Sequence, residues 1–316
     1  MELVSIDDIR SAAADITGHV LRTPLMRAPW DADLWLKAES LQPVGSFKLR
    51  GATHAVARLT AAQRSGGVVT HSSGNHGLAL AHAATAAGVP CRVVVPAGAP
   101  TAKVDRIRAF GVEVMTVPPP RRGPAAQQLA TETGAVLVPP FDDRRIIAGQ
   151  GTIGLEIVAD LPDVDVVLVP VGGGGLSSGV ATAVRALRPA AAVIGVEPEW
   201  AADARDSLAA GSVVSWGEER TYRTCADGLR LPPSELTLAH LLERLDGIVT
   251  VTEDEIQAAL SRLVRDARLV VEPSAAVSVA ARLFRRAELP AGRTAAVVTG
   301  GNVDPAVLAA ALADPS

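Results

Sequence analysis

The chain has 316 residues, 48% of them hydrophobic, and a formal net charge of −4 at pH 7. This length is enough for one large domain or two modest domains with complete cores. The mildly acidic balance and the 3% aromatic content give no indication of a nucleic acid or an anionic membrane as a partner. Cys91 and Cys225 form no disulfide framework and no zinc-binding spacing. The beginning is unlike a signal peptide and no apolar run spans a membrane, so we expect a cytoplasmic protein with reduced thiols.

Helices and strands alternate through the first half of the chain. A helix is expected at residues 6–16, because Ser5 and Asp8 have the spacing of a capping box. The alternating segments that follow predict right-handed crossovers and a small parallel sheet. The strands are expected at residues 68–70, 92–95, 112–117 and 136–138, and the helices at residues 76–87, 101–110 and 125–133.

Prolines, arginines and a glycine make up residues 118–124. This run is expected to be an exposed loop, because it suits neither the continuation of a helix nor a central strand. Its two arginines are most simply solvated, although Arg122 could face a binding site.

Valine-rich apolar runs dominate the second half. Thr252 and Glu255 form a capping box ahead of one of the helical patterns between these runs. Unbroken apolar runs are typical of parallel strands covered on both faces. The pattern predicts two α/β layers, and no repeat or low-complexity linker marks a boundary between them. The strands are expected at residues 164–171, 193–196, 248–251, 269–271 and 295–298.

Lys48 lies in the first turn of a predicted helix. It follows an apolar run at residues 34–36 and a short loop at residues 42–45, and Ser46 is expected to cap a helix that runs on to Leu59. The positive end of the helix dipole and the apolar neighbours both disfavour the ammonium form and lower the pKa of the lysine. A lysine that is neutral near pH 7 can attack a carbonyl carbon and hold pyridoxal phosphate (PLP) as a Schiff base. Taken alone, a surface lysine at a helix start is the simpler interpretation.

Four glycines, Gly172 to Gly175, follow a predicted buried strand and precede a helical pattern. Successive glycines allow backbone amides to converge, and the helix start adds positive potential, which together make a phosphate cradle. For the glycines alone, a flexible turn is an equally good interpretation. A dinucleotide site is the obvious competitor, but the spacing is not Gly-x-Gly-x-x-Gly and the strand lies past mid-chain.

A second glycine-containing loop, residues 72–77, lies between a predicted strand and a predicted helix. The Asn75 amide could donate a hydrogen bond to a phenolate oxygen, which the 3-hydroxyl of PLP would supply. The hydroxyl of Ser72 and the backbone amides of the loop could bind a substrate carboxylate. His76 is expected to be a helix-start residue with a structural hydrogen bond rather than a catalytic base.

These motifs, in this order, resemble the fold-type II PLP enzymes, in the branch of threonine dehydratases and serine racemases. The resemblance begins at residues 22–25 (RTPL) and continues through residues 149–152 (GQGT). It ends at residues 272–276 (EPSAA) and 299–304 (TGGNVD). Several ordered motifs over nearly the whole length are far more specific than any one glycine run.

The resemblance implies a two-domain α/β fold of the tryptophan synthase β type, with parallel-rich sheets covered by helices. A small mobile domain, residues 66–142, is then inserted in a large PLP-binding domain made of residues 1–65 and 143–316. The chain stops soon after the last motif, so the C-terminal regulatory domain of biosynthetic threonine dehydratases and its feedback inhibition by isoleucine are not expected.

The resemblance also implies roles for side chains. Lys48 holds the cofactor and takes the α-proton, and Ser73 is the second acid or base, on the opposite face of the cofactor. Thr299 places a hydroxyl against the pyridine nitrogen, which leaves a weaker electron sink than a carboxylate would. The residues expected to bind the cofactor are Phe47, Lys48, Asn75, Gly172, Gly173, Gly174, Gly175, Leu176 and Thr299. Those expected to bind the substrate are Ser72, Ser73, Asn75 and His76.

A divalent cation, Mg²⁺, is expected from the same resemblance. Glu197, Asp203 and the carbonyl group of Ala201 match the family's cation ligands. Two carboxylates and a carbonyl suit a hard cation, although most such pairs taken alone are solvated. The expected role of the ion is structural or activating, not catalytic.

The chain departs from the family pattern at three places. Val44 stands where threonine is common, and Cys225 interrupts the usual Thr-Ile-Ala-Asp-Gly. Leu231 falls where mammalian-type serine racemases carry a substrate-contacting serine. These changes argue against a dedicated racemase. They leave the identity of the substrate's side chain undetermined.

We therefore expect a PLP-dependent ammonia-lyase, or dehydratase, that converts L-threonine and/or L-serine to a 2-oxo acid and ammonia by β-elimination of the hydroxyl group. An amino-acid racemase with Lys48 and Ser73 as paired bases, or a 3-hydroxyaspartate dehydratase, is the alternative within PLP chemistry. A nucleotide-binding oxidoreductase and a silent phosphate-ligand binder are alternatives of other classes. The expected assembly is a homodimer or homotetramer acting on a small hydroxy amino acid.

Overall fold

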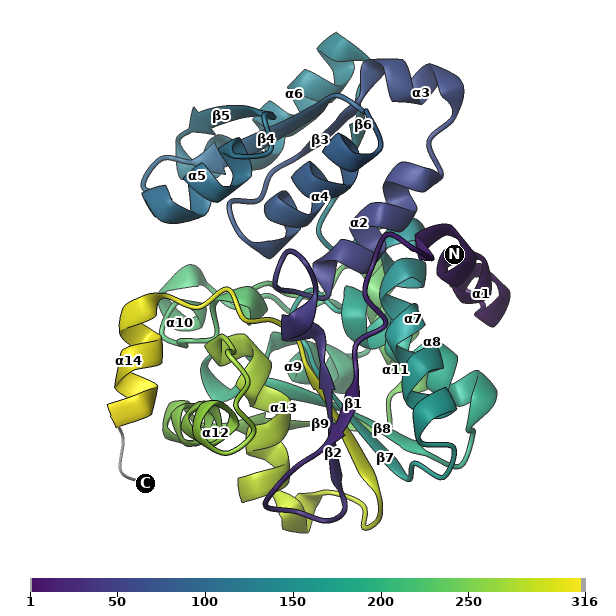
Figure 1. Ribbon diagram of the computed structural model, residues 1–316, viewed down its shortest axis with the longest axis vertical. Helices are drawn as coiled ribbons and strands as arrows, with labels where there is room; N and C mark the ends of the chain where they lie inside the picture. The colour runs from purple at the N-terminus through teal and green to yellow at the C-terminus, as the bar shows by residue number, and fades with distance from the viewer. Residues whose placement is uncertain (1, 314–316) are drawn as a thin grey trace.

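The computed structural model describes residues 2–313, which form a six-stranded and a four-stranded sheet arranged along the long axis of the molecule (Figure 1). Neighbouring strands are parallel except for the antiparallel pair β1–β2. The predicted α/β fold with parallel-rich sheets is therefore confirmed. The larger sheet contains, in order, β1 (Leu25–Arg27), β2 (Leu34–Ala38), β10 (Thr294–Val298), β7 (Val166–Pro170), β8 (Ala192–Pro198) and β9 (Gly247–Val251). The smaller sheet contains β5 (Glu113–Val117), β4 (Cys91–Pro96), β3 (Val68–Thr70) and β6 (Val136–Leu137).

Helices cover both faces of both sheets (Figure 1). The predicted capping boxes form at the starts of α1 and α12. Among the described residues, no helix is long and apolar enough to cross a membrane. The helices of the first half are α1 (Ile6–Ile16), α2 (Lys48–Ala57), α3 (Ala61–Gly66), α4 (Asn75–Ala86), α5 (Thr101–Arg108), α6 (Arg122–Thr133) and α7 (Arg144–Asp160). Those of the second half are α8 (Gly175–Leu187), α9 (Asp203–Ala210), α10 (Glu218–Thr221), α11 (Glu235–Arg244), α12 (Glu253–Arg265), α13 (Pro273–Phe284) and α14 (Pro305–Ala313).

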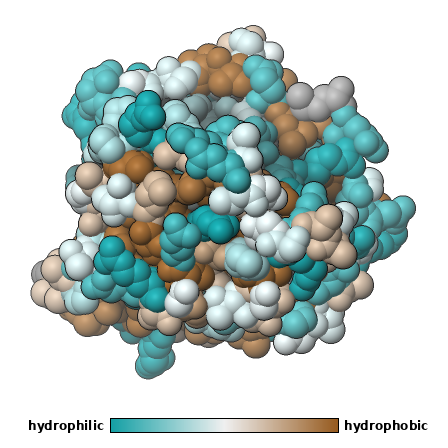
Figure 2. Space-filling view, turned by 90° about the horizontal axis from the view of Figure 1, so that it is seen from above, coloured by the Kyte–Doolittle hydropathy of each residue, from teal (hydrophilic) through white to brown (hydrophobic). Residues whose placement is uncertain are grey.

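Alternation along the strands divides the hydrophobic core between the two faces of each sheet. On β7, Val166 and Leu168 belong to the cluster built with α12 and α13, whereas Val167 and Val169 pack with α8. In the smaller sheet, one face packs on α2 and α4 and the other on α6. Seen from the end that carries the smaller sheet, the surface shows hydrophilic side chains with apolar areas between them (Figure 2).

Helix α2 lies between the two sheets, and Lys48 is its first residue, so the packing of α2 determines where Lys48 lies. Its apolar side chains join the core of the smaller sheet, and its other side packs against α7. A Cβ atom at Gly149 would lie 2.5 Å from Cα of Gly51, so the two helices can approach this closely only because glycine stands at this point. The strands of the smaller sheet all fall within the predicted residues 66–142. The exact domain boundaries stay predictions.

A buried charged cluster lies beneath α2. The guanidinium of Arg50 binds both carboxylate oxygens of Glu39 at 2.8 Å and an oxygen of Glu156 at 2.7 Å. Lys37 donates to the second oxygen of Glu156 at 2.5 Å. The side chains of Arg50, Glu39 and Lys37 are 0% exposed, so each charge depends on its partners rather than on water.

Two local predictions were wrong. Ser46 does not cap α2, because the N-cap residue is Phe47 and no side chain caps it. Ser46 instead forms a backbone bridge with Gly300. Residues 269–271 form no strand, and Leu269 and Val271 instead join the hydrophobic core built with α12 and α13.

The proline-rich run also differs from the prediction of a loop. Pro119–Arg121 form a 3-10 helix, and α6 already begins at Arg122. Proline is tolerated there because the first turn of a helix has no intrahelical acceptors for its N–H groups. Arg121 is exposed as predicted, whereas Arg122 is half-buried.

Candidate active site

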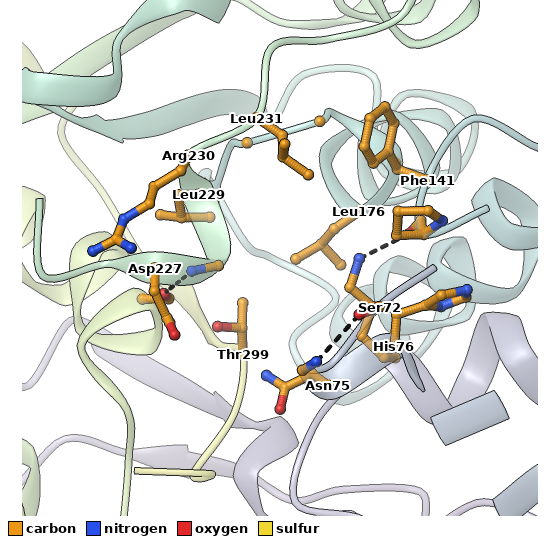
Figure 3. A pocket seen from close by; sticks show the side chains of 18 of the residues that line it. Ser72, Asn75, His76, Phe141, Leu176, Asp227, Leu229, Arg230, Leu231 and Thr299 are labelled. Carbon is orange, nitrogen blue, oxygen red and sulfur yellow. Dashed lines mark hydrogen bonds between the residues drawn. The ribbon is translucent and has the colours of Figure 1, made fainter. Parts of the chain in front are cut away.

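A cavity of about 510 Å³ is lined by segments that are connected to the strands of both sheets (Figure 3). This volume is typical of a small-molecule or cofactor site. The predicted metal ligands, Glu197, Ala201 and Asp203, do not line it. The predicted cofactor and substrate residues all do: Phe47, Lys48, Ser72, Ser73, Asn75, His76, Gly172, Gly173, Gly174, Gly175, Leu176 and Thr299.

Lys48, the first residue of α2, faces the cavity. Its Nζ donates to the carbonyl oxygen of Pro140 at 2.8 Å and lies 4.9 Å from the centre of the Phe47 ring. Burial lowers the pKa of Lys48 to about 8, although the nearby Glu272 carboxylate acts to raise it. A substantial fraction of this amine is therefore neutral, and hence nucleophilic, at slightly alkaline pH.

The glycine loop connects β7 to α8 and forms another wall. Gly174 has φ +83°, and a Cβ atom at Gly173 would lie 2.3 Å from the Phe141 ring. Thr237 donates to the carbonyl oxygen of Gly173 at 2.8 Å, which holds the loop from outside. Since α8 begins at Gly175, the free N–H groups of its first turn lie at the cavity and make an anion site.

The loop before α4 also lines the cavity. Ser72 accepts a hydrogen bond from the N–H of Gly74 at 3.3 Å, and Ser73 is half-buried beside it. His76 is 2% exposed, and its Nε2 lies 2.9 Å from the carbonyl oxygen of Val138. Burial, with a contribution from the charge of Lys48, lowers the pKa of His76 to about 3. The ring is therefore neutral and structurally engaged, which agrees with the prediction for this residue.

Asn75 and Thr299 both line the cavity (Figure 3). Asn75 donates to Glu272 at 2.7 Å and accepts from Asn302 at 2.7 Å. Thr299 is 4% exposed and follows the end of β10. Burial raises the pKa of Glu272 to about 7, and the charge of Asp227 acts in the same direction. Glu272 and Asn302 belong to motifs that carry the family resemblance, but neither was predicted as a site residue, because their role depends on contacts between distant segments.

Cationic side chains of the smaller sheet's helices also line the cavity and were not predicted as site residues. Lys103 on α5 forms an ion pair with Asp227 at 2.8 Å, which joins the two halves of the molecule. Arg106 on the same helix and Arg122 at the start of α6 line the same cavity. The sequence offered only one hint, that Arg122 could face a site.

Glu197 and Asp203 lie at the end of β8 and the start of α9. Each is 0% exposed, and burial raises the pKa of both; that of Glu197 rises to about 8. The two oxygens of Glu197 accept the backbone N–H groups of Ala204 and Arg205 at 2.9 and 2.8 Å. Within residues 2–313, no group of three or more His, Cys, Asp or Glu side chains is placed to hold a metal ion.

The comparisons with known proteins agree with this geometry. The family model described as "Pyridoxal-phosphate dependent enzyme" matches residues 16–300. The chain is 38% identical over 311 residues to the beta-hydroxyaspartate dehydratase of Paracoccus denitrificans, covering 96% of this chain and 98% of that protein. It is 39% identical over 312 residues to the L-threonine ammonia-lyase of Thermotoga maritima, covering 96% of this chain and 76% of that one.

Solved structures show the same fold. Maize serine racemase superposes with a TM-score of 0.92 at 36% identity, covering 98% of this chain and 97% of that one. One alternative interpretation of the glycine run was a nucleotide-binding oxidoreductase. These matches do not support it. The chain belongs to the family of pyridoxal-phosphate dependent enzymes.

Proposed function

We propose that this protein is a PLP-dependent ammonia-lyase that converts L-threonine and/or L-serine to a 2-oxo acid and ammonia. The observation that carries the proposal is the position of Lys48. Its amine, with a pKa lowered to about 8, faces the cavity that also receives the glycine loop and the start of α4. One part of the cavity wall thus suits a phosphate, another suits a carboxylate, and a nucleophilic amine faces the same cavity.

The residues present fit PLP. Lys48 would bind its aldehyde carbon, and the N-terminus of α8 would bind its phosphate. Asn75 would donate to its 3-oxygen, and Thr299 would place a hydroxyl against its pyridine nitrogen. Gly173 lies directly against Phe141, so any side chain at position 173 would displace the glycine loop that would bind the phosphate. When bound, the cofactor supplies the electron sink for the charge left on the α-carbon.

The chain's own groups would then perform the acid–base work. The N-terminus of α4, with the Ser72 hydroxyl, binds and orients the substrate carboxylate. Lys48, as the neutral amine, takes the α-proton. The neighbouring apolar groups Phe47 and Leu176 limit the water around that amine.

The test is a substrate screen with purified protein supplied with PLP. We expect 2-oxo acid and ammonia in equal amounts from L-threonine or L-serine, and none from either substrate with Lys48→Ala. A wild-type protein that binds PLP but releases no 2-oxo acid from any hydroxy amino acid would overturn the proposal.

A second candidate substrate is 3-hydroxyaspartate. Arg106 and Arg122 line the cavity, whereas Lys103, one turn earlier on α5, is paired with Asp227. The two arginines favour a substrate with a second carboxylate. A relative from Paracoccus denitrificans is named a beta-hydroxyaspartate dehydratase. The screen therefore includes L-threo-3-hydroxyaspartate.

Racemisation is the alternative reaction at the same site. Ser73 and Lys48 both line the cavity, so an acid or base from each could reach a bound substrate. Leu231 also lines it, at the position where a substrate-contacting serine was expected for a mammalian-type racemase. We therefore rank racemisation below elimination.

For the divalent cation, we propose the site at Glu197, Asp203 and the carbonyl oxygen of Ala201. Both oxygens of Asp203 are buried and have no well-formed hydrogen bond within the described chain; the backbone N–H groups of Asp203 and Trp216 lie close enough only to oppose part of the rise in its pKa, so a cation would relieve the cost of burial. Mg²⁺ should raise the melting temperature of the wild type but not of Asp203→Asn. A wild-type melting temperature that responds to neither Mg²⁺ nor a chelator would contradict the site. A homodimer or homotetramer and a cytoplasmic location stay predictions.

A further inference from the structure

The carboxamide of Asn75 is held at both ends. Its Nδ2 donates to Oε1 of Glu272 at 2.7 Å, and its Oδ1 accepts from Nδ2 of Asn302 at 2.7 Å. Nδ2 of Asn302 also donates to the carbonyl oxygen of Val44 at 2.9 Å, which uses both of its N–H groups. An amide with a donor against its oxygen and an acceptor against its nitrogen has one favourable orientation.

Two glycines make room for the partners of Asn75. A Cβ atom at Gly300 would lie 2.5 Å from Oε1 of Glu272, and one at Gly45 would lie 2.5 Å from Oδ1 of Asn302. Gly45 also has φ +74°, a conformation that favours glycine. Glu272 is 7% exposed, and its backbone N–H donates to the carbonyl oxygen of Gly300 at 3.0 Å. The backbone thus holds both side chains in place.

One N–H group of Asn75 is left over. Its other N–H binds Glu272, and this one has no acceptor within residues 2–313. Asn75 lines the cavity with Thr299 (Figure 3), and Lys48 lines it too. We propose that Glu272 and Asn302 are positioning residues, which fix the Asn75 amide so that this N–H donates to the 3-oxygen of PLP. The inference rests on the assignment of the cavity to PLP.

Orientation matters because the two ends of the amide have opposite effects on an oxygen anion. The N–H end makes a charge-assisted hydrogen bond, whereas the Oδ1 end repels the anion. Without the acceptor at Glu272, or with an acceptor in place of the Asn302 donor, the amide is free to turn its oxygen toward the cavity. A lost hydrogen bond to a charged group corresponds to about a 10- to 100-fold loss in affinity.

The test compares two ligands on the cofactor-free protein by isothermal titration calorimetry. PLP carries the 3-oxygen, and 3-deoxypyridoxal 5′-phosphate lacks it but keeps the aldehyde and the phosphate. The ratio of their dissociation constants isolates the interaction with the 3-oxygen. We expect this preference for PLP to fall about tenfold or more in Glu272→Ala and Asn302→Asp. Glu272→Gln keeps an acceptor for Asn75 and should retain the preference.

Asn75→Ala lacks the amide and gives the ratio expected without this hydrogen bond. The double variant Asn75→Ala/Glu272→Ala should give the same ratio, because Glu272 acts only through Asn75. Asn302→Asp serves as an independent variant if Glu272→Ala folds poorly. An unchanged ratio in both Glu272→Ala and Asn302→Asp, or an equal loss of affinity for both ligands, would overturn the positioning role alone. A wild type that binds neither ligand would overturn this inference together with the cofactor assignment.

Discussion

The backbone N–H of Phe47 donates to the carbonyl oxygen of Thr299 at 3.0 Å. Beside this bond, Ser46 and Gly300 form an antiparallel bridge. The segment that starts α2 and the turn that follows β10 are therefore one structural unit, although they come from opposite ends of the chain. Because Lys48 follows directly, these backbone hydrogen bonds help to fix where Lys48 lies relative to Thr299.

Lys48→Ala should abolish both the visible absorbance of bound PLP and the release of 2-oxo acid. A neutral amine at this position is required for the covalent bond to the cofactor and for removal of the α-proton. Borohydride reduction followed by peptide mapping measures the attachment directly. Lys48→Arg is the matched control, since it keeps the positive charge and should lose both properties too. A pyridoxyl adduct on another lysine would contradict the assignment.

The rate of PLP capture by the cofactor-free protein should rise with pH through a midpoint of about 8. Burial lowers the pKa of Lys48 to about 8, and only the neutral amine attacks the aldehyde. Glu272→Gln should move this midpoint to lower pH, because the Glu272 carboxylate raises the pKa of Lys48. Stopped-flow absorbance from pH 6 to 10 measures it. Glu113→Gln, an exposed change on β5, should leave the midpoint in place; a shift there equal to that of Glu272→Gln would argue against a local effect.

Much of the architecture was predictable from local signals. The capping boxes of α1 and α12 and the strand–helix alternation depend on neighbouring residues, and they form as predicted. Ser46 has the side chain of a cap, but its backbone pairs with Gly300, a residue that no local pattern connects to it. Residues 269–271 have the composition of a strand, but Leu269 and Val271 are buried in the core without pairing with a strand. Tertiary contacts decided both cases.

The site divides in the same way. Residues within recognisable motifs, such as Lys48 and the glycine loop, were predicted to meet at one cavity, and they do line one. Arg106 lies on an ordinary amphipathic helix, and only the packing of α5 brings it to the cavity. Asn302 acts through its hydrogen bond to Asn75. The two residues are far apart in the sequence, and no local pattern indicates that they lie within hydrogen-bond distance.

Arg106→Gln and Arg122→Gln should each lower kcat/KM for L-threo-3-hydroxyaspartate about three- to tenfold relative to L-serine. Both arginines line the cavity, so their charge acts on a second carboxylate and much less on a hydroxymethyl group. The ratio of the two kcat/KM values measures the effect. Arg121→Gln is the matched control, because Arg121 is exposed and outside the cavity wall. Equal losses for both substrates would mean that the arginines do not read the second carboxylate.

Glu39→Ala should lower the free energy of unfolding by about 3–5 kcal/mol, because it leaves the buried Arg50 without a main partner. Although burial acts to raise the pKa of Glu39, the charge of Arg50 holds it below its usual value. The contribution of Glu39 is therefore present above about pH 4.5 and is lost as the pH falls further. Urea unfolding at pH 7 and pH 4 measures both effects. Glu113→Ala breaks an ion pair with Arg92 at the surface and should cost about 1 kcal/mol or less; an equal loss in the two variants would contradict the argument.

Ser73→Ala should separate elimination from racemisation. Elimination needs one base, and Lys48 serves, whereas racemisation needs a second group to return a proton to the opposite face of the α-carbon. Ser73 lines the cavity with Lys48 and is the candidate for that second group. The variant should lose most of any D-serine formation, by about 10²- to 10⁴-fold, while part of the release of pyruvate from L-serine survives.

The ratio of D-serine to pyruvate is the informative quantity, because Ser73 adjoins Ser72 in the loop that would bind the substrate carboxylate. Ser72→Ala is the matched control: a carboxylate-binding residue should lower both products in proportion and leave the ratio unchanged. If Ser73→Ala behaves in the same way, Ser73 is a binding residue. If the wild type converts L-serine to D-serine faster than to pyruvate, racemisation is the main reaction and the ammonia-lyase assignment is wrong.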